Sequence, residues 1–455
     1  MNIKRSNIEV SPPARIISVS FAMVILIGTI LLSLPIATKS GDATPIIDAL
    51  FTATSATCVT GLIIYDTFTH WSMFGQCVIL ALIQVGGLGL VTLATFFNLI
   101  VGKKIGIRNM QLAKESVSTN SVADVNKMVR IVMGFSFSAE LVGALVLATT
   151  FVPQYGAYGI FMSIFMSVSA FCNAGFDVCG MQGEFVSLTN YTDNYVVIAT
   201  ISLLIVVGGL GFIVWNNLME YRKNKRLVLH TKIVLIITGV LITFGTIVFI
   251  VFEWNNATTM GGLSIPEKIS AAIFQSISCR TAGFNSIPLA PLSEGSKVFS
   301  SLFMFIGAAP GSTGGGIKVT TLAVILMTVF CVARGQEETV IAKRRVPFGT
   351  VYRAITIMFF GVAVVSITTG ILMLTSPIEQ SGMTVLDAVY EVTSAFATTG
   401  LSVGPTSVAT FPSKLALVLT MYIGRVGPVS FALAMSLKRS AGRKEIMPEA
   451  KIIVG

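Results

Sequence analysis

TATSATCVTGL, residues 52–62, is an uncharged, threonine-rich run that lies between two long apolar segments and contains one glycine. The surrounding chain is unusually apolar, because 53% of its 455 residues are hydrophobic, 11% are charged and the mean hydropathy is +0.83. Ordinary soluble domains carry about a quarter charged residues. The composition predicts an integral membrane protein, in which a polar run at this place needs a specific explanation.

Eight segments are apolar over about the 20 residues that a membrane-spanning helix needs. They lie near residues 17–37, 75–100, 128–152, 195–216, 233–253, 298–332, 351–375 and 413–437. The six Cys lack CxxC spacing and there are only two His, so neither a zinc site nor a disulfide framework is expected. The first apolar segment is too long for a cleavable signal peptide. We expect an all-α integral membrane protein without a sizeable soluble domain.

The positions of the basic residues predict the topology. The net charge is +10, and most Lys and Arg lie in the N-terminal segment, near 101–130, 217–232 and 333–353, and in the C-terminal tail. The alternate connections carry few basic residues, and the connection 153–194 carries none. Because cytoplasmic loops are enriched in Lys and Arg, both termini are expected in the cytoplasm. The charges flank spans, so orientation and anionic lipid explain them better than nucleic-acid binding does.

The external connections share a pattern that recurs at intervals of 114, 108 and 117 residues. Asp48 and Asp387 each stand thirteen residues before the glycine of their unit, and three units share a Ser-Ala pair. A further glycine follows in each second span, at Gly86, Gly208, Gly307 and Gly424. The four versions are DALFTATSATCVTGL with Gly61, FMSVSAFCNAGF with Gly175, FQSISCRTAGF with Gly283, and DAVYEVTSAFATTGL with Gly400.

Each unit is therefore interpreted as a span, a re-entrant segment of roughly a dozen residues and a second span. A unit with two spans preserves its orientation, so the four units can surround one axis along the membrane normal. The re-entrant helices would direct their negative C-terminal ends at the membrane centre, which favours a cation. Irregular backbone is tolerated there only if it is buried or lines an aqueous path. The run at 52–62 is thus predicted to form part of an ion filter, whose glycine adopts positive φ at little cost.

These four runs resemble the filters of the Trk/Ktr/HKT cation transporters, and the short loops are most similar to membrane subunits of bacterial Ktr potassium uptake systems. The resemblance covers nearly the whole chain. It implies four degenerate relatives of the potassium-channel signature TVGYG, whose backbone carbonyls line the filter of those channels. The matching residues are Thr57, Cys58, Val59, Thr60 and Gly61; Cys172, Asn173, Ala174, Gly175 and Phe176; Cys279, Arg280, Thr281, Ala282 and Gly283; and Ala397, Thr398, Thr399, Gly400 and Leu401.

The resemblance also implies the ion and the partners. In plant members, Ser in place of the first filter glycine accompanies sodium preference, whereas this chain has Gly61, so K⁺ is the expected ion, with Na⁺ as a possible coupling ion. The family implies a homodimer with one pore per protomer, in the bacterial cytoplasmic membrane, resting on a cytosolic ring of nucleotide-binding (RCK-type) regulatory subunits. No organic cofactor is expected. The units are placed at 1–102, 103–226, 227–345 and 346–437, followed by a cytoplasmic tail at 438–455.

The third unit contains GAAPGSTGGGIKVTT at 307–321, which interrupts an apolar segment too long for one crossing. A phosphate loop is rejected, because Ile317 separates the last glycine from Lys318 and no strand is expected before it. The resemblance implies an intramembrane gating loop beneath the filter, and a kink with only a packing role is the alternative. The expected gate residues are Gly311, Ser312, Thr313, Gly314, Gly315, Gly316, Lys318 and Arg425.

Several charged side chains have two interpretations. Arg425 either holds loop carbonyls near a gate or pairs with a buried acid such as Glu140. Arg280 is expected to point away from the ion and to brace the filter through Glu391 or Glu267. The external acids Asp66, Asp177, Glu184 and Asp193 either concentrate cations or are ordinary solvated carboxylates. Cys58, Cys172 and Cys279 are expected to be small buried residues, and the GGLG clusters at 86–89 and 208–211 to allow close helix packing.

Three classes of function follow from these patterns. The first is a channel-like potassium translocating subunit, the second an alternating-access carrier for Na⁺ or another small solute, and the third a membrane-embedded enzyme. Parallel units disfavour the common inverted-repeat carriers. The spans lack clustered His, Cys or Asp, which disfavours hydrolase or redox chemistry. The sequence therefore favours the ion translocating subunit.

Overall fold

The computed structural model describes residues 13–100 and 125–427. The N-terminal segment, the basic loop after residue 100, the end of the last expected span and the tail at 438–455 lie outside these residues. The described chain is helical apart from one short hairpin, β1 (Val340–Ile341) and β2 (Arg344–Arg345). Its two turn residues, Ala342 and Lys343, have φ of 47° and 62°, as a tight hairpin turn requires.

Four helices in the described residues are long and apolar enough to cross a membrane without a break. Each begins one of the four units and exposes large apolar side chains, such as Phe359 and Val251, which fits contact with lipid. They are α1 (Pro13–Leu32), α7 (Val125–Tyr155), α11 (Leu229–Glu253) and α15 (Phe348–Thr375).

A shorter helix of 13 to 16 residues follows each long one and is buried in the protein. These helices are too short to cross a bilayer, and each ends at the start of one of the four filter-like runs. They are α2 (Ile46–Cys58), α8 (Ala157–Cys172), α12 (Ile265–Ser278) and α16 (Val385–Ala397).

The second apolar segment is interrupted in each of the first three units, which differs from the expectation of a break in the third unit alone. Gly89, Gly211 and Gly427 have φ of 82°, 88° and 90° and stand three residues after the second-span glycine of their units. This backbone conformation ends a helix and suits glycine. The helices concerned are α4 (Met73–Leu88) and α5 (Leu90–Ile100), α9 (Tyr195–Gly209) and α10 (Phe212–Asn224), and α17 (Phe411–Val426).

The bend between α9 and α10 is 94°, and together they form the one bent pair that could count as a fifth span in the described chain. In the third unit the break is the predicted glycine loop, since α13 (Glu294–Phe305) and α14 (Val319–Ala333) are separated by residues 306–318. The interruption of the segment 298–332 is thereby confirmed. The short elements between helices are α3 (Thr67–His70) and the 3-10 turns η1 (Pro35–Ala37), η2 (Gly180–Gln182), η3 (Thr189–Tyr191), η4 (Glu379–Ser381) and η5 (Pro405–Val408).

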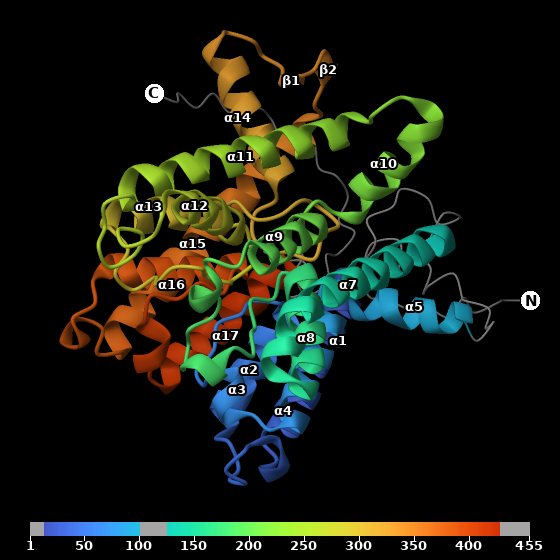
Figure 1. Cartoon of the computed structure of the whole chain (residues 1–455). Coiled ribbons are helices and arrows are strands. Elements are labelled where there is room, and N and C mark those ends of the chain that lie inside the picture. The colour runs from blue at the N-terminus through green and yellow to red at the C-terminus, as the bar shows by residue number, and fades with distance from the viewer. Residues whose placement is uncertain (1–12, 101–124, 428–455) are drawn as a thin grey trace, which may run out of the picture.

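The units follow one another around a closed ring. In Figure 1 the colour passes around the molecule from blue below, through teal on the right and green above, to red on the left. The second-segment helix of each unit packs on the short helix of the next, and the fourth unit packs on the first. The pairs are α4 with α8, α9 with α12, α13 with α16, and α17 with α2.

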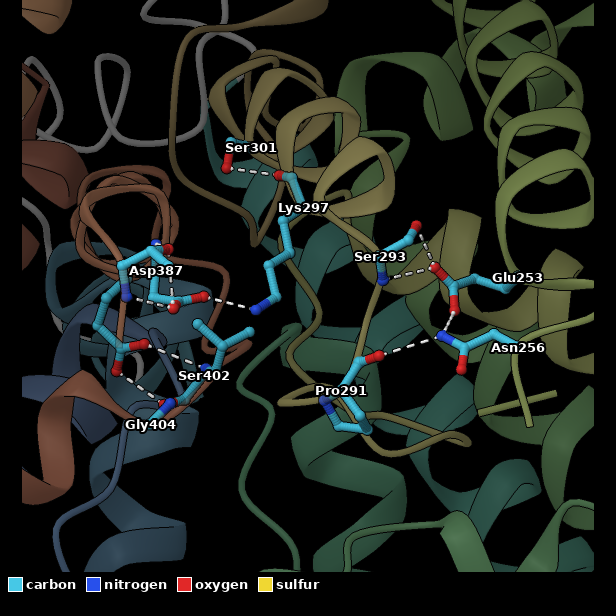
Figure 2. Close-up of polar contacts among 12 residues, drawn as sticks. Glu253, Asn256, Pro291, Ser293, Lys297, Ser301, Asp387, Ser402 and Gly404 are labelled. Carbon is cyan, nitrogen blue, oxygen red and sulfur yellow. Dashed lines mark hydrogen bonds and ion pairs between the residues drawn. The ribbon is translucent and has the colours of Figure 1, made fainter. Parts of the chain in front are cut away.

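Two of these junctions carry equivalent ion pairs. Lys297 on α13 contacts Asp387 on α16 at 2.6 Å (Figure 2), and Lys414 on α17 contacts Asp48 on α2 at 2.6 Å. All four side chains are largely buried, with relative exposures of 7% to 18%. The two acids are those that stand thirteen residues before the glycines of their units. The shared position is therefore explained by a shared contact between neighbouring units.

Small residues let the helices of each unit approach closely. A β-carbon placed on Gly86 would lie 2.8 Å from the carbonyl carbon of Thr57, and on Gly424 it would lie 2.8 Å from that of Phe396. Gly208 lies in the same way against Phe171. Real side chains do not tolerate such contacts, so the close packing predicted for the clusters at 86–89 and 208–211 is confirmed at Gly86 and Gly208, and Gly424 packs in the same way. The consequence is that α4, α9 and α17 rest directly on the ends of the short helices.

Candidate functional site

The glycines of the four runs meet in one ring. Gly61, Gly175, Gly283 and Gly400 have φ of 92°, 69°, 86° and 91°, which is the region that favours glycine. Each lies against the next unit, and a β-carbon on any of them would collide with its neighbour's backbone. An added β-carbon would lie 2.5 Å from the Ala174 oxygen at Gly61, 2.8 Å from the Ala282 oxygen at Gly175, 2.5 Å from the Thr399 oxygen at Gly283 and 2.8 Å from the Gly61 α-carbon at Gly400.

A second left-handed residue precedes each glycine by two positions. These residues are Val59, Asn173, Thr281 and Thr398, with φ of 58°, 59°, 66° and 52°. A β-branched residue adopts this conformation only where the surrounding structure enforces it, so the backbone is strained here. The left-handed residue recurs in all four units and is β-branched in three of them, which distinguishes the runs from ordinary turns. Sequence reasoning missed it, because none of the four residues is glycine.

The short helices end in a way that creates this conformation. The amide of Thr60 donates to the Ser55 carbonyl at 2.7 Å and that of Val59 donates to the Ala56 carbonyl at 3.2 Å. This pair of bonds is a Schellman ending, which places a left-handed residue just after the helix. The Ser-Ala pairs 169–170 and 394–395 accept the same bonds in α8 and α16. The Ser-Ala pairs of the sequence thus supply the carbonyls that cap these three short helices.

The serine hydroxyls fix the glycine end of the runs. Ser55 accepts from the Gly61 amide at 3.1 Å, and Ser394 accepts from the Gly400 amide at 3.0 Å. In the second unit Ser169 instead donates to the Phe176 carbonyl at 2.6 Å. In the third unit the serine stands one residue later, and Ser278 donates to the Phe284 carbonyl. The four runs are therefore braced by equivalent side chains in unequal ways.

The threonine hydroxyls of the runs lie buried without a hydrogen-bond partner among the described residues. A buried polar group normally has a partner, and two of these hydroxyls, those of Thr281 and Thr398, face Gly314 and Gly315 of the glycine loop. The C-terminal ends of the four short helices meet at the same place and add negative potential. An arrangement of this kind can hold a cation. The hydroxyls are those of Thr57, Thr60, Thr281, Thr398 and Thr399.

A cavity of about 470 Å³ lies on one side of the ring and is lined by all four glycines. Its polar wall includes Asp177, Ser187, Asn285, Ser402 and Thr406. We refer to it as the mouth cavity. It is large enough to admit a hydrated ion and leads onto the glycine ring. The side of the ring that carries it is the side of the connections predicted to be external.

Of the four external acids, Asp177 lines the mouth cavity and the other three do not. Asp66 caps α3 and accepts from the Phe185 amide at 3.1 Å, while Glu184 and Asp193 are exposed elsewhere. Burial raises the pKa of the Asp177 carboxyl to about 7. The hydrogen bond from the Cys179 amide acts in the opposite direction, whereas the nearby Asp66 charge also raises the pKa. The group can therefore change charge near neutral pH.

The glycine loop of the third unit lies on the opposite side of the runs. A β-carbon on Gly314 would lie 2.7 Å from that of Ala308 and 3.2 Å from that of Thr281, and one on Gly315 would lie 3.1 Å from that of Thr398. The Thr313 hydroxyl donates to the Phe171 carbonyl at 3.1 Å. The loop thus touches the second, third and fourth units at their runs. Gly311 and Gly316, with φ of 68° and 67°, turn the chain at its two ends.

Two cations hold the carbonyls of this loop. Lys318 donates to the Gly314 carbonyl at 2.7 Å and to that of Gly315 at 3.2 Å. Arg425 donates to the Thr313 carbonyl from one nitrogen and to the Gly86 carbonyl from another. Ser312 closes the turn by donating to the Ala309 carbonyl at 2.6 Å. All the expected gate residues therefore gather in one place, with charge placed directly below the ring.

Two of the alternatives for charged residues are wrong. Arg425 does not pair with Glu140, because that carboxylate accepts from the Gln84 amide at 3.1 Å at both oxygens. Arg280 does not brace the filter through Glu391 or Glu267. Its guanidinium instead donates to the Thr238 hydroxyl at 3.3 Å on α11. Both acids have closer partners on their own helix or in the segment next to it, and sequence spacing carries no signal for such choices.

The remaining candidates are the three cysteines next to the runs. Cys58, Cys172 and Cys279 are buried free thiols. Among residues 13–100 and 125–427, no group of three His, Cys, Asp or Glu could hold a metal ion. The four runs and the loop therefore form the one site that the sequence candidates share in the described chain.

Residues 3–444 match the sequence profile of the family described as TrkH, cation transport protein. The chain belongs to the TrkH family. It is 39% identical over 444 residues to the Ktr system potassium uptake protein B of Bacillus subtilis, covering 97% of both chains. It is 37% identical over 447 residues to the potassium/sodium uptake protein NtpJ of Enterococcus hirae, again covering 97% of both.

The TrkH fold is also found among solved structures. The crystal structure of the potassium transporter TrkH from Vibrio parahaemolyticus matches with a TM-score of 0.71 at 16% identity. The match covers 96% of this chain and 87% of that one. The helical architecture described above is therefore that of the TrkH family, and the family resemblance predicted from the four runs is confirmed.

Proposed function

We propose that the chain is a channel-like potassium translocating subunit that mediates K⁺ uptake across a bacterial cytoplasmic membrane. The observation that carries the proposal is the ring of four positive-φ glycines between the mouth cavity and the glycine loop. The ring has an open approach on one side and a closed loop on the other. Such a path suits an ion that passes in single file. The names of the relatives, potassium uptake and potassium/sodium uptake, support the choice of ion.

The runs are proposed to act as a selectivity filter. Their left-handed residues redirect backbone carbonyls away from the helical ladder, and carbonyls can replace the hydration shell of an ion. The unpaired threonine hydroxyls add further oxygen ligands. The helix ends favour positive charge without supplying a full anion that would trap the ion. Gly61 is present at the position where plant members with sodium preference carry Ser, which favours K⁺ over Na⁺.

The loop at 306–318 is proposed to be the gate. It lies across the path, and Lys318 and Arg425 put two positive charges there. These charges raise the barrier for a cation and also hold the loop carbonyls in place. A flexible glycine segment held by a few hydrogen bonds can exchange between two arrangements. Opening would then require the loop to leave the Arg425 side chain.

The architecture proposed for this function is four span, re-entrant helix, span units around a pseudo-fourfold axis, with eight spans in all. The cyclic packing of each second-segment helix on the next short helix supports it. The mouth cavity is placed outside the cell and both termini inside. A homodimer and a cytosolic nucleotide-binding ring are proposed as partners on family resemblance, and the name of the potassium/sodium relative supports sodium dependence.

Reconstituted flux tests the function directly. The purified chain in proteoliposomes should take up K⁺ down a gradient, with Rb⁺ as a substitute and Na⁺ as a poor one, at rates that a membrane potential changes. Empty vesicles prepared in parallel provide the control. Uptake of an organic solute without ion current, or no ion flux in either direction from correctly inserted protein, would contradict the proposal.

A further inference from the structure

Glu391 on α16 is a carboxylate buried behind the wall of the mouth cavity, with an exposed fraction of 0%. It accepts hydrogen bonds from the Ser402 hydroxyl at 2.8 Å, from the Val403 amide at 3.3 Å and from the Thr406 hydroxyl. All three donors belong to the segment that follows the fourth filter run. A buried charge without an ion-pair partner is costly, so this one is held by a dedicated set of donors.

The donors of Glu391 are themselves part of the mouth. Ser402, Val403 and Thr406 line the cavity, as does Gly404, whose amide donates to Ser402 at 3.2 Å. Figure 2 shows Ser402 and Gly404 beside each other, near the Asp387 end of α16. The carboxylate therefore determines the shape of the cavity wall without being exposed in it. Its charge also lies immediately behind that wall.

The other units have no acid at this position. Nine residues before the glycine, where the fourth unit has Glu391, the first three have Thr52, Met166 and Phe274. The ring order places the fourth unit opposite the second, which contributes Asp177 to the cavity. Two carboxylates thus lie across the mouth from each other, one in the wall and one behind it. Acidic groups therefore lie on two opposite sides of the mouth, although the filter has four units.

We propose that Glu391 is a positioning residue for ion capture, which fixes the outer wall of the fourth filter run and supplies the negative potential that sets the affinity for K⁺. The proposal rests on the proposed function of the ring as a potassium filter. A carboxylate that three donors hold behind a narrow mouth attracts cations there before they shed water. Loss of the charge alone should therefore weaken capture more than it slows passage through the filter.

The test is uptake kinetics of Glu391→Gln, Glu391→Asp and Thr406→Val against the parent chain in proteoliposomes. Glutamine keeps the shape and removes the charge, and KM for K⁺ should rise about fivefold with little change in the maximal rate. Glu391→Asp should recover most of the affinity. Thr406→Val keeps the carboxylate but removes one donor, and KM should rise in the same direction by less.

Glu253 provides the matched control. It is also a carboxylate with 0% exposure, it accepts from the Ser293 hydroxyl at 2.7 Å and the Asn256 amide at 2.8 Å (Figure 2), and none of these residues lines the mouth cavity. Glu253→Gln should lower the melting temperature to an extent similar to that of Glu391→Gln, with KM unchanged. A role of Glu391 in folding alone would give equal effects in both variants.

The outcomes separate this proposal from the one it rests on. If the parent chain transports K⁺ but Glu391→Gln and Thr406→Val keep its KM, the positioning role is overturned while the filter stands. If the parent chain transports no K⁺, the proposed function itself fails. Should Glu391→Gln not insert, Thr406→Val decides, since an unchanged KM there contradicts the proposal and a raised one supports it.

Discussion

Arg425 on α17 donates a hydrogen bond to the carbonyl of Thr313 in the glycine loop, although the two residues are 112 positions apart in the chain. The same guanidinium reaches Gly86 near the end of α4. One side chain therefore joins the first, third and fourth units directly beneath the filter runs. A contact that ties the loop to two other units is suited to hold a closed state, and its removal gives the most direct test of the gate.

Arg425→Ala, or deletion of residues 311–316, should increase K⁺ flux and reduce its dependence on any regulatory subunit. Both changes remove what holds the loop across the path, so the population shifts toward the open state while the filter is untouched. Flux should rise and the preference for K⁺ over Na⁺ should persist. Uptake rates in proteoliposomes, with K⁺ and Na⁺ measured separately, check both expectations.

The control for this experiment is Arg345→Ala, which removes an exposed hairpin cation paired with Glu338 at 3.0 Å. Its flux should equal that of the parent chain. A loss of flux in both loop variants, in protein that remains folded and inserted, would mean that the loop supports the conduction path and does not close it.

Gly61→Ser should lower the discrimination between K⁺ and Na⁺. The added β-carbon would lie 2.5 Å from the Ala174 oxygen, and the backbone has a φ of 92° that serine rarely adopts. Both effects distort one quarter of the carbonyl ring. Changes at Gly175, Gly283 and Gly400 should also act, but unequally, because their serine braces differ. Competition between Rb⁺ and Na⁺ in uptake measures the effect.

The matched control for that experiment is Gly239→Ser. Gly239 lies in α11, and a β-carbon there would meet no atom within 4 Å. Its uptake and ion preference should stay at the parental values. The filter assignment would be wrong if Gly61→Ser and Gly239→Ser behaved alike.

The affinity for K⁺ should increase as external pH rises through about 7. Burial holds the pKa of Asp177 near that value, so the carboxyl is mostly neutral below it and ionised above it. The ionised form adds a negative charge to the mouth cavity, and a bound cation in turn favours ionisation. KM for K⁺ measured between about pH 6 and 8 should fall, and Asp177→Asn should reduce that change. If KM of Asp177→Asn changed with pH as it does in the parent chain, Asp177 would not be the origin of the pH dependence.

Asp387→Asn should destabilise the protein by about 3 kcal/mol, since it leaves the largely buried Lys297 ammonium without its partner. The thermal unfolding midpoint in detergent measures the loss. Adding Lys297→Met to that variant should recover part of it, because the uncompensated charge is removed. If the double variant were less stable than Asp387→Asn, the ion pair would not be the origin of the effect.

The sequence predicted the features that depend on local composition. Four glycines at regular intervals indicated four filter runs, and the cluster at 311–316 indicated the broken helix, because only glycine readily tolerates those backbone positions. The shared Ser-Ala pairs were visible as a pattern, but their role was not. They supply the carbonyls of a Schellman ending, and this appears only when the helix is built.

Other features depended on the assembled molecule. Val59 and Thr398 are left-handed because they follow the Schellman endings of α2 and α16, although β-branched residues disfavour this conformation. The breaks at Gly89 and Gly211 were missed, because a glycine cluster in an apolar segment does not distinguish a break from close packing. The partner of Arg280 is set by where α11 lies, and spacing along the chain contains no information about that.

The pair of Asp48 and Lys414 joins residues 366 positions apart, and this has a consequence for biosynthesis. A ribosome delivers α2 to the membrane long before α17 exists. During that interval, of the two side chains that hold Asp48, only Tyr65, which donates to it at 2.8 Å, has been made. Until Lys414 has been synthesised, the Asp48 carboxylate lies near apolar segments without its counter-ion. A nascent chain that ends before Lys414 thus cannot complete the pair, so the junction between the first and fourth units closes only when the last helix has been made.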